Sequence, residues 1–406
     1  MKVSRVERHI VDSNQQLIDL SFASKNLYNC ATFIMRQNFI KNHKVIKYGA
    51  MDKIIKRDYP EVYKGLPAQS SQQTLRLVEK NWKSFFKSNH SYKQNPDKFK
   101  ARPKLPKYKD KEKGLNVVIF TNQQCKLTDN QIYFPKKAQL PKLNTLVNNL
   151  QQVRIIPKYE HFVIEVVYKK EVLNHELNPK NVLGVDLGLN NLATLVSNQP
   201  DIRPMLINGK PLKSINQYFN KKKAKLMSFI DNKGTSHSIT RLSKKRWQKI
   251  DDYLHKASRD LIDYAIDTDS GLIVIGENKH WKQGINTGKK NNQNFVSIPY
   301  DKFKAMITYK AFDVGIDVIF TEESYTSKSS HLDNDPLPIY KEGESHSFTG
   351  KRISRGLYRW SKGIINADLN GALGIIKKVV PEALDLVIEI RNRGVGFAPF
   401  KVVKTF

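Results

Sequence analysis

Residues 181–196, with the sequence NVLGVDLGLNNLATLV, form an apolar run that carries one carboxylate, Asp186, with Gly184 and Gly188 on either side. An apolar run of this kind is typical of a strand that a sheet buries. A buried carboxylate costs several kcal/mol unless a cation or hydrogen-bond donors receive it. The chain must therefore provide a partner for Asp186, and this need constrains the fold more than any other feature.

From about residue 180 onward, after the linker-like segment LNHELNPK, apolar strands alternate with segments of helical spacing. Strands are predicted at 182–187, 192–196, 204–207, 272–276 and 316–320, and helices at 212–230, 240–268, 299–314 and 368–378. Such alternation favours an α/β domain. We assign it to residues 180–398 and treat residues 399–406 as a C-terminal tail.

The N-terminal part has a different pattern, with short strands at both ends of a helical stretch. Strands predicted at 2–13, 115–120, 131–135, 151–159 and 161–170 indicate a small β-barrel. Apolar residues at helical spacing over 20–42 and 67–88 predict a helical domain inserted into that barrel. The barrel would comprise residues 1–19 and 115–176, and the helical domain residues 20–114. The length of 406 residues agrees with two or three domains.

The charge balance is unusual, with 69 Lys and Arg against 38 Asp and Glu and a net charge of +31. Self-repulsion makes such an excess unfavourable unless a polyanion compensates it, so nucleic acid is the expected partner. An anionic membrane is the weaker alternative, because no apolar run approaches the roughly 20 residues of a spanning helix. We therefore expect no membrane partner. The N-terminus also lacks the apolar region of a signal peptide, and the only cysteines, Cys30 and Cys125, fit a reducing cytoplasm.

Two segments are candidates for contacting nucleic acid. Residues 93–113 are rich in lysine and proline and contain Phe99 and Tyr108, which suits phosphate neutralisation and base stacking by an extended basic arm. The alternative is a disordered solubilising linker. The helix predicted at 67–88 has a polar face with Gln73, Arg76, Lys80 and Lys83. Gln can pair with adenine in the major groove, although a solvated helix face is an equally simple explanation.

Carboxylates follow or interrupt several of the predicted strands and begin one helix. Asp368 starts the helix in GIINADLNGALGIIKK, Glu277 follows the strand GLIVIG, and Glu322 and Glu323 follow DVIFT. Ligand sites collect at the carboxyl ends of strands in such sheets, and carboxylates that converge there repel one another unless divalent cations lie between them. Two Mg²⁺ ions, with Mn²⁺ as an alternative, would support phosphodiester cleavage. Taken singly, Asp186 could accept backbone hydrogen bonds and Asp368 could be a helix N-cap.

Several stretches resemble the TnpB family, proteins of insertion sequences that are similar to the type V CRISPR nucleases. GVDLGLNNLATL resembles the family's first RuvC motif, NADLNGALGI resembles the third, and HKASRDLIDYA, NNQNFVSIPYDKFKAMITYKA and KNLYNCATFIMRQ resemble other segments. The resemblance implies an RNase H-like RuvC nuclease domain, preceded by a split β-barrel (wedge) domain and a helical recognition domain. It also implies RNA-guided cleavage of double-stranded DNA, with a guide RNA derived from the transposon end and a short flanking DNA motif read by the protein.

The sequence departs from the family pattern at two points. Many relatives carry a four-cysteine zinc ribbon between the second and third motifs, but this chain has no cysteine there, so we expect no zinc and interpret His331 and His346 as loop residues. Many relatives also end the second-motif strand with the catalytic Glu, where this chain has Gly276. Because a one-residue step turns a strand side chain to the opposite face, Glu277 is the weaker candidate. EESYTSK resembles the family branches that supply the acid from the next strand, which favours Glu323.

The sequence therefore predicts a Mg²⁺-dependent, RNA-guided DNA endonuclease in which Asp186, Glu323 and Asp368 are the catalytic metal ligands, with Glu277 as the alternative to Glu323. Lys328, Arg352 and Arg355 would hold phosphates, unless they are simply solvated charges. We expect a monomer with one RNA, in a prokaryotic cytoplasm and associated with the nucleoid. The rival hypothesis is a nuclease-inactive RNA-guided repressor, and a transposase acting by itself is a third alternative.

Overall fold

The computed structural model describes residues 1–158, 160–230, 234–277, 298–341, 343–354, 356–381 and 399–402. The chain divides into two compact units, Met1–Glu171 and Val172–Phe406, and each is described here by itself. Among the described residues, no helix combines the length and the apolar character that crossing a membrane requires.

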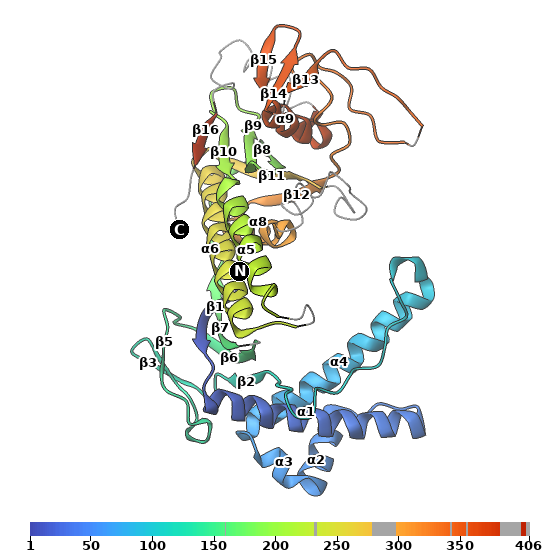
Figure 1. Ribbon diagram of the computed structural model, residues 1–406, viewed down its shortest axis with the longest axis vertical. Helices are drawn as coiled ribbons and strands as arrows, with labels where there is room; N and C mark the ends of the chain where they lie inside the picture. The colour runs from blue at the N-terminus through green and yellow to red at the C-terminus, as the bar shows by residue number, and fades with distance from the viewer. Residues whose placement is uncertain are drawn as a thin grey trace. The chain divides into compact units, whose positions relative to one another are not determined.

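The first unit joins helices and antiparallel strands around one apolar core (Figure 1). Its main sheet has the order β1-β7-β6-β2, from Lys2–Asp12, His161–Glu171, Leu150–Pro157 and Val118–Thr121, and a smaller sheet contains β3 (Lys126–Thr128), β4 (Gln131–Tyr133) and β5 (Leu143–Asn144). The helices are α1 (Gln15–Asn42), α2 (Tyr48–Asp58), α3 (Pro60–Lys64) and α4 (Ala68–Gln94), with 3₁₀ turns at Pro96–Lys98 and Lys136–Ala138. A closed barrel stays a prediction, because the described strands pair in two separate sheets.

The helices and the strands of this unit are not independent of each other. Leu27 of α1 and Trp82 of α4 belong to the same buried cluster as Val118 and Phe120 of β2. The apolar stripe that predicted α4 is thus the face that packs toward the strands, and the lysine-rich face remains outside. The separate helical domain expected at 20–114 shares its core with the strands.

The second unit is built on a six-stranded mixed sheet of order β12-β11-β8-β9-β10-β16. Its strands are β8 (Asn178–Leu187), β9 (Asn191–Ser197), β10 (Met205–Asn208), β11 (Ser270–Gly276), β12 (Asp317–Thr321) and β16 (Phe400–Val402). The strands β8, β9 and β10 form an antiparallel meander, while β11 and β12 run parallel to β8. A second sheet contains β13 (Lys351–Ser354), β14 (Leu357–Trp360) and β15 (Gly363–Asn366).

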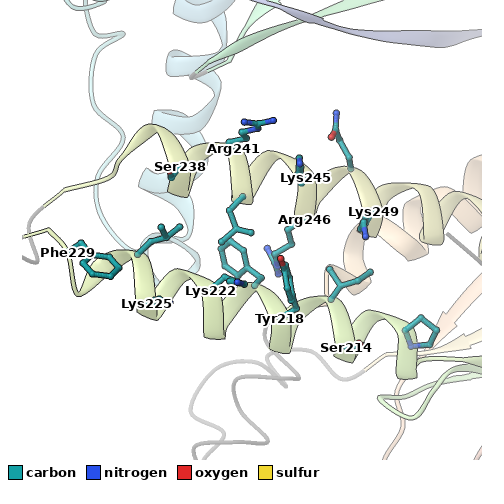
Figure 2. A pocket seen from close by; sticks show the side chains of 16 residues that line it. Ser214, Tyr218, Lys222, Lys225, Phe229, Ser238, Arg241, Lys245, Arg246 and Lys249 are labelled. Atoms are coloured by element: carbon teal, nitrogen blue, oxygen red, sulfur yellow. The ribbon is translucent and has the colours of Figure 1, made fainter.

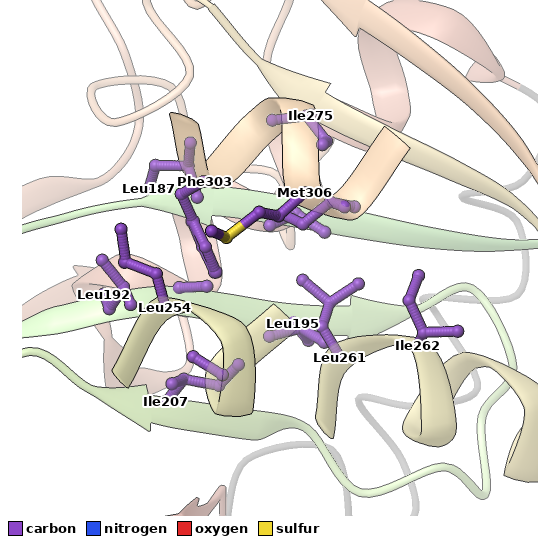
Figure 3. Packing of buried hydrophobic residues seen from close by; sticks show 14 of the residues in the cluster. Leu187, Leu192, Leu195, Ile207, Leu254, Leu261, Ile262, Ile275, Phe303 and Met306 are labelled. Carbon is purple, nitrogen blue, oxygen red and sulfur yellow. The ribbon is translucent and has the colours of Figure 1, made fainter. Parts of the chain in front are cut away.

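Helices cover the two faces of the six-stranded sheet differently (Figure 1). α5 (Lys210–Met227) and α6 (His237–Asp267) form a hairpin, shown from close by in Figure 2, and α6 packs with α8 (Tyr300–Phe312) on one face. Figure 3 shows this layer, in which Leu254 of α6 and Phe303 of α8 pack with Leu187 of β8. α9 (Ala367–Val379) packs on the other face, where Ile375 and Ile376 pack with Val182 and Val274.

Candidate active site

Strand β8 presents Asp186 to the face of the sheet that α9 covers. The odd-numbered residues Leu183, Val185 and Leu187 belong to the core under α6 and α8, so the even-numbered residues face α9. Gly184 is required there, because a β-carbon on it would lie 2.6 Å from the backbone oxygen of Ala372 in α9. Asp186, two residues further along the strand, is therefore directed at the beginning of α9.

The first turn of α9 leaves room for the Asp186 carboxylate. A β-carbon on Gly371 would lie 2.7 Å from Asp186 Oδ2, so the glycine allows the carboxylate to lie directly against the helix. Gly371 follows Asp368 by three residues, which places both on one side of the first turn. The two aspartates that the sequence singled out are thus brought to the same end of α9.

Asp368 is in the first turn of α9, but it is not the helix cap. Asn366 is the N-cap, and its side-chain oxygen accepts a hydrogen bond of 2.8 Å from the backbone N–H of Asp368. The Asp368 carboxylate instead accepts a 2.8 Å hydrogen bond from Nδ2 of Asn191 and lies 3.6 Å from a guanidinium nitrogen of Arg352. The N-cap explanation for Asp368 is therefore wrong, and its carboxylate is directed at β9 and β13.

Glu323 occupies the space above Gly276. A β-carbon on Gly276 would overlap Oε1 of Glu323 and would lie 2.7 Å from Cδ1 of Ile375 in α9. The carboxylate of Glu323, which follows β12, thus lies on the α9 face at the point where a side chain from residue 276 would begin. Because Gly276 at the end of β11 has no side chain, the carboxylate of Glu323 after β12 can occupy this space.

Glu277 points to the other face of the sheet. Its backbone N–H donates to Thr321 O at 2.7 Å, which continues the pairing of β11 with β12. Its carboxylate forms an ion pair with Lys304 of α8, a side chain that is only 12% exposed and that also lies 3.2 Å from Asp301. This position agrees with the reversal of facing that a one-residue step produces in a strand.

Burial and neighbouring charges raise the pKa of two of the three carboxyl groups. Burial raises the pKa of Asp186 well above its usual range, and the charges of Glu323 and Asp368 raise it further against the opposing effect of Arg352. Burial also raises the pKa of Glu323 to about 7, with Lys304 opposing and Glu277 adding to the shift. The hydroxyl of Tyr300 donates to Gly188 O at 2.9 Å and closes the loop after β8.

The donor set suits hard divalent cations. All three side chains offer carboxylate oxygens, the ligands that Mg²⁺ prefers, and a cation would relieve the repulsion that raises the pKa of Asp186. Among the residues that the structure describes, no three side chains of the His, Cys, Asp and Glu types are grouped so that all could hold one metal ion. A two-ion arrangement divides the carboxylates between the ions, and it therefore does not need such a trio.

The other predicted site residues fall in both units. Gln73, Arg76, Lys80 and Lys83 lie on α4 in the first unit, where Arg76 stacks 4.0 Å from the ring centroid of Tyr48 and Lys83 pairs with Glu79. In the second unit Lys328 is exposed and 5.8 Å from the ring centroid of Tyr325, while Arg352 is the cation that reaches Asp368. Arg355 lies outside the described residues.

The basic arm after α4 is an extended segment held along α1. Arg36 donates to Pro106 O at 2.8 Å, Lys25 donates to Lys111 O at 2.6 Å, and Asn29 and Lys109 exchange two hydrogen bonds of 2.9 Å. Tyr108 lies under the guanidinium of Arg36, at 4.7 Å from its ring centroid. The aromatic residue expected to stack on bases thus stacks on a cation of the protein.

A cysteine-free turn region connects Glu323 to α9. Asp333 and Asp335 both accept hydrogen bonds from Ser330 and Thr349, and Asp333 also accepts one from Ser361. These two carboxylates therefore connect three separate points of this region. His331 lies in a turn as expected, but it is buried, and its ring donates from Nε2 to Thr326 O at 2.8 Å. Asn370 of α9 donates to Ser329 O at 2.8 Å. His346 lies 3.6 Å from Glu344.

Asn191 is a site residue that the sequence reasoning missed. It begins β9 within the GLNNLATL motif, and its side chain is 2.8 Å from Asp368 although 177 residues separate the two. An amide at the start of a strand that pairs with the Asp186 strand was the available signal.

Comparisons with known proteins show what the chain is similar to. The family model OrfB_IS605, probable transposase, matches residues 165–282, and the model Cas12f1-like, TNB domain, matches residues 300–375. The TnpB-like protein ORF457 of Acidianus two-tailed virus is 25% identical over 90% of this chain and 84% of its own length. The chain is thus similar to TnpB-like proteins over most of its length.

Two further likenesses concern CRISPR-associated proteins. The CRISPR-associated endodeoxyribonuclease Cas12f2 of Micrarchaeota archaeon (strain CG1_02_47_40) is 28% identical over 66% of this chain, which spans about half (49%) of that relative's length. The cryo-EM structure of a Cas12f1–sgRNA–target DNA complex is 14% identical, with a TM-score of 0.54, and the likeness covers 89% of this chain and 83% of that one. This likeness shows a shared fold.

Proposed function

We propose that this chain is a TnpB-family protein and a metal-dependent, RNA-guided endonuclease that cuts double-stranded DNA next to a short flanking motif. The observation that carries the proposal is the convergence of Asp186, Glu323 and Asp368 from three elements onto one face of the sheet. The relative named as an endodeoxyribonuclease, and the Cas12f1 structure bound to guide RNA and target DNA, support the same activity class.

The second unit would be an RNase H-like RuvC domain. The antiparallel meander β8–β10, flanked by the parallel strands β11 and β12, supports this assignment. The first unit would contain the wedge and recognition domains, with α4 and the basic arm as surfaces for nucleic acid. The net charge of +31 supports binding of a guide RNA and the target duplex. We further propose that the protein acts as a cytoplasmic monomer with one guide RNA.

The chain's own residues have distinct tasks in this proposal. Asp186, Glu323 and Asp368 would hold two Mg²⁺ or Mn²⁺ ions, and no zinc is required. Two such ions, when bound, supply an activated water nucleophile and stabilise the leaving oxygen of the phosphodiester. Asn191 fixes the Asp368 carboxylate through its amide. Arg352 places a positive charge beside that carboxylate, where it would contact the phosphate that approaches the site.

The position of Glu323 argues against the alternative of a nuclease-inactive repressor. That alternative rested on the missing glutamate at position 276. Because the Glu323 carboxylate lies where the side chain of residue 276 would start, a third acid remains available on the α9 face. Occupancy without cleavage is therefore the less supported function.

Plasmid cleavage by the purified protein–RNA complex tests the proposal. Asp186→Ala should lower the cleavage rate by about 10³-fold or more, since several kcal/mol of transition-state stabilisation are lost. RNA-dependent binding of target DNA should persist. Glu322→Gln is the matched control, because it removes a neighbouring carboxylate charge, paired with Lys378, and should leave cleavage within threefold of wild type. An Asp186→Ala protein that still cuts would refute the proposal.

A further inference from the structure

The hairpin of α5 and α6 carries a groove that the nuclease proposal does not use (Figure 2). The groove has a volume of about 1270 Å³ and is lined by side chains from both helices. Ile215, Phe219, Leu226 and Leu242 provide apolar lining. Lysine and arginine side chains from both helices also line it: Lys222, Lys225, Arg241, Lys245, Arg246 and Lys249.

The described stretches of the two helices that line the groove contain Lys and Arg but no Asp or Glu. The helix Lys210–Met227 contains six lysines, and residues 237–249 contain five Lys and Arg, without one Asp or Glu in either stretch. The acids of α6 begin only at Asp251 and Asp252, which pair with Lys302 and Lys256. The hairpin therefore concentrates positive charge at the groove, which favours a polyanionic ligand.

Aromatic side chains are exposed at the same place. Tyr218 is 59% exposed and Phe229 is 72% exposed, and both line the groove. Arg241, Lys245 and Lys249 follow at four-residue intervals, so they rise in a row along one face of α6 at about 6 Å per step. A row of cations suits successive phosphates, and exposed rings beside an apolar lining suit unpaired bases. A duplex would offer its phosphates but would hide the faces of its bases, so a single strand fits better.

The position of the α5–α6 hairpin relative to the sheet indicates which nucleic-acid strand would lie in the groove. Leu212 of α5 packs in the core under α6 and α8, whereas Asp186 lies on the face that α9 covers. A strand in the groove thus lies across the sheet from the three carboxylates. It is not the strand whose phosphate they would meet, which favours the guide RNA over the DNA substrate.

We propose that the groove between α5 and α6, with its Lys222, Lys225, Arg241 and Lys245 cations and its exposed Tyr218 and Phe229 rings, binds a single-stranded segment of the guide RNA. The inference rests on the proposed RNA-guided function and deepens it. The RNA backbone runs along the cation rows, and unpaired bases stack on the two rings.

Two triple variants of the full chain test the electrostatic part. The groove triple Lys222→Ala, Lys225→Ala, Lys245→Ala removes three lining cations, and the control triple Lys221→Ala, Lys223→Ala, Lys244→Ala removes three neighbours outside the lining. Binding of the RNA that co-purifies with the chain is measured between 50 and 200 mM salt. Each lost phosphate contact lowers the salt slope by about 0.7, so the wild type should lose about 20-fold more affinity over this range than the groove triple.

The control triple should follow the wild-type slope. Equal slopes for the two triples would overturn the proposal, because the lysines would then act only through the overall charge. Alanine favours helix, so circular dichroism should show both triples folded.

Photocrosslinking distinguishes the strands and separates this inference from the nuclease proposal. The complex is assembled with 4-thiouridine-substituted RNA or with 4-thiothymidine-substituted target DNA, and crosslinked peptides are identified by mass spectrometry. RNA adducts on peptides containing Tyr218 or Phe229 are expected, and Tyr218→Ala with Phe229→Ala should remove them. DNA adducts there, or RNA adducts elsewhere only, would overturn the groove assignment while cleavage persists. Failure of the proposed function would appear instead as absence of guided cleavage.

Discussion

Gly276→Ala tests whether the Glu323 carboxylate needs the space that the missing side chain of residue 276 leaves. The new β-carbon would overlap the Glu323 carboxylate and lie 2.7 Å from Ile375 Cδ1, whereas ordinary contacts between carbon atoms are about 3.5–4.0 Å. Overpacking of this size costs about 1–3 kcal/mol. That corresponds to a fall in Tm of about 2–12 °C for a unit of this size. Because the end of the Glu323 side chain is the most movable part, the carboxylate is displaced.

A displacement of about 1 Å at a reacting centre can cost about 100-fold in rate, so Gly276→Ala should cut target plasmid about 100-fold more slowly. Gly363→Ala is the control, because its β-carbon would meet Trp360 only at 3.4 Å and should change neither rate nor Tm appreciably. Adding Glu323→Asp to Gly276→Ala shortens the crowded side chain and should restore part of the rate. A Gly276→Ala protein that cuts within threefold of wild type would refute the reasoning.

Three further outcomes follow from individual contacts. Asn191→Ala removes the amide that holds Asp368 and should weaken Mg²⁺ activation of cleavage by about 10–100-fold, while high Mg²⁺ restores the rate; an unchanged Mg²⁺ titration would contradict this role. Burial lowers the pKa of His331 to about 4, so below pH 6.5 the unfolded chain takes up a proton that the folded chain refuses. His331 should therefore lower the free energy of unfolding by about 2 kcal/mol from pH 7 to pH 5, whereas Glu323, with its raised pKa, changes it in the opposite direction. In urea titrations, the stability of wild type relative to His331→Gln should fall by about 2 kcal/mol over this range, and a constant difference would contradict the assignment. Asp333→Ala removes the acceptor of Ser330 and Ser361 and should lower the free energy of unfolding by about 1–3 kcal/mol, against no change for the exposed Glu344→Ala.

The sequence indicated the acid cluster because its physical signals are local. Gly184 and Asp186 stand two residues apart on one strand, and the period of two fixes that they share a face. The same period disfavoured Glu277, and the structure places it with Lys304 on the other face. The contact of Glu323 with Gly276 could not be predicted from this period, because it depends on how the loop after β12 approaches the end of β11.

Other features escaped because they depend on contacts between distant segments. The strands β13–β15 are four residues each, and β13 and β14 mix apolar with charged side chains, so the apolar pattern is too short to predict a sheet. The helices of the first unit share one apolar core with its strands, so this core contains residues from both sides of the predicted boundary at residue 114. Such a shared core is visible only from tertiary packing. Asn366 outcompetes Asp368 for the cap position, which residue preferences alone do not decide, because Asn and Asp are equally good caps.

The central claim is that divalent cations gather the three carboxylates on the α9 face of the sheet. A structure of the protein with guide RNA, uncleavable target DNA and Mn²⁺, with anomalous scattering recorded for manganese, measures this directly. We predict two manganese positions about 4 Å apart, with oxygen ligands from Asp186, Glu323 and Asp368. Manganese at Glu277 with Glu323 unliganded, or no manganese within reach of Asp186, would contradict the account.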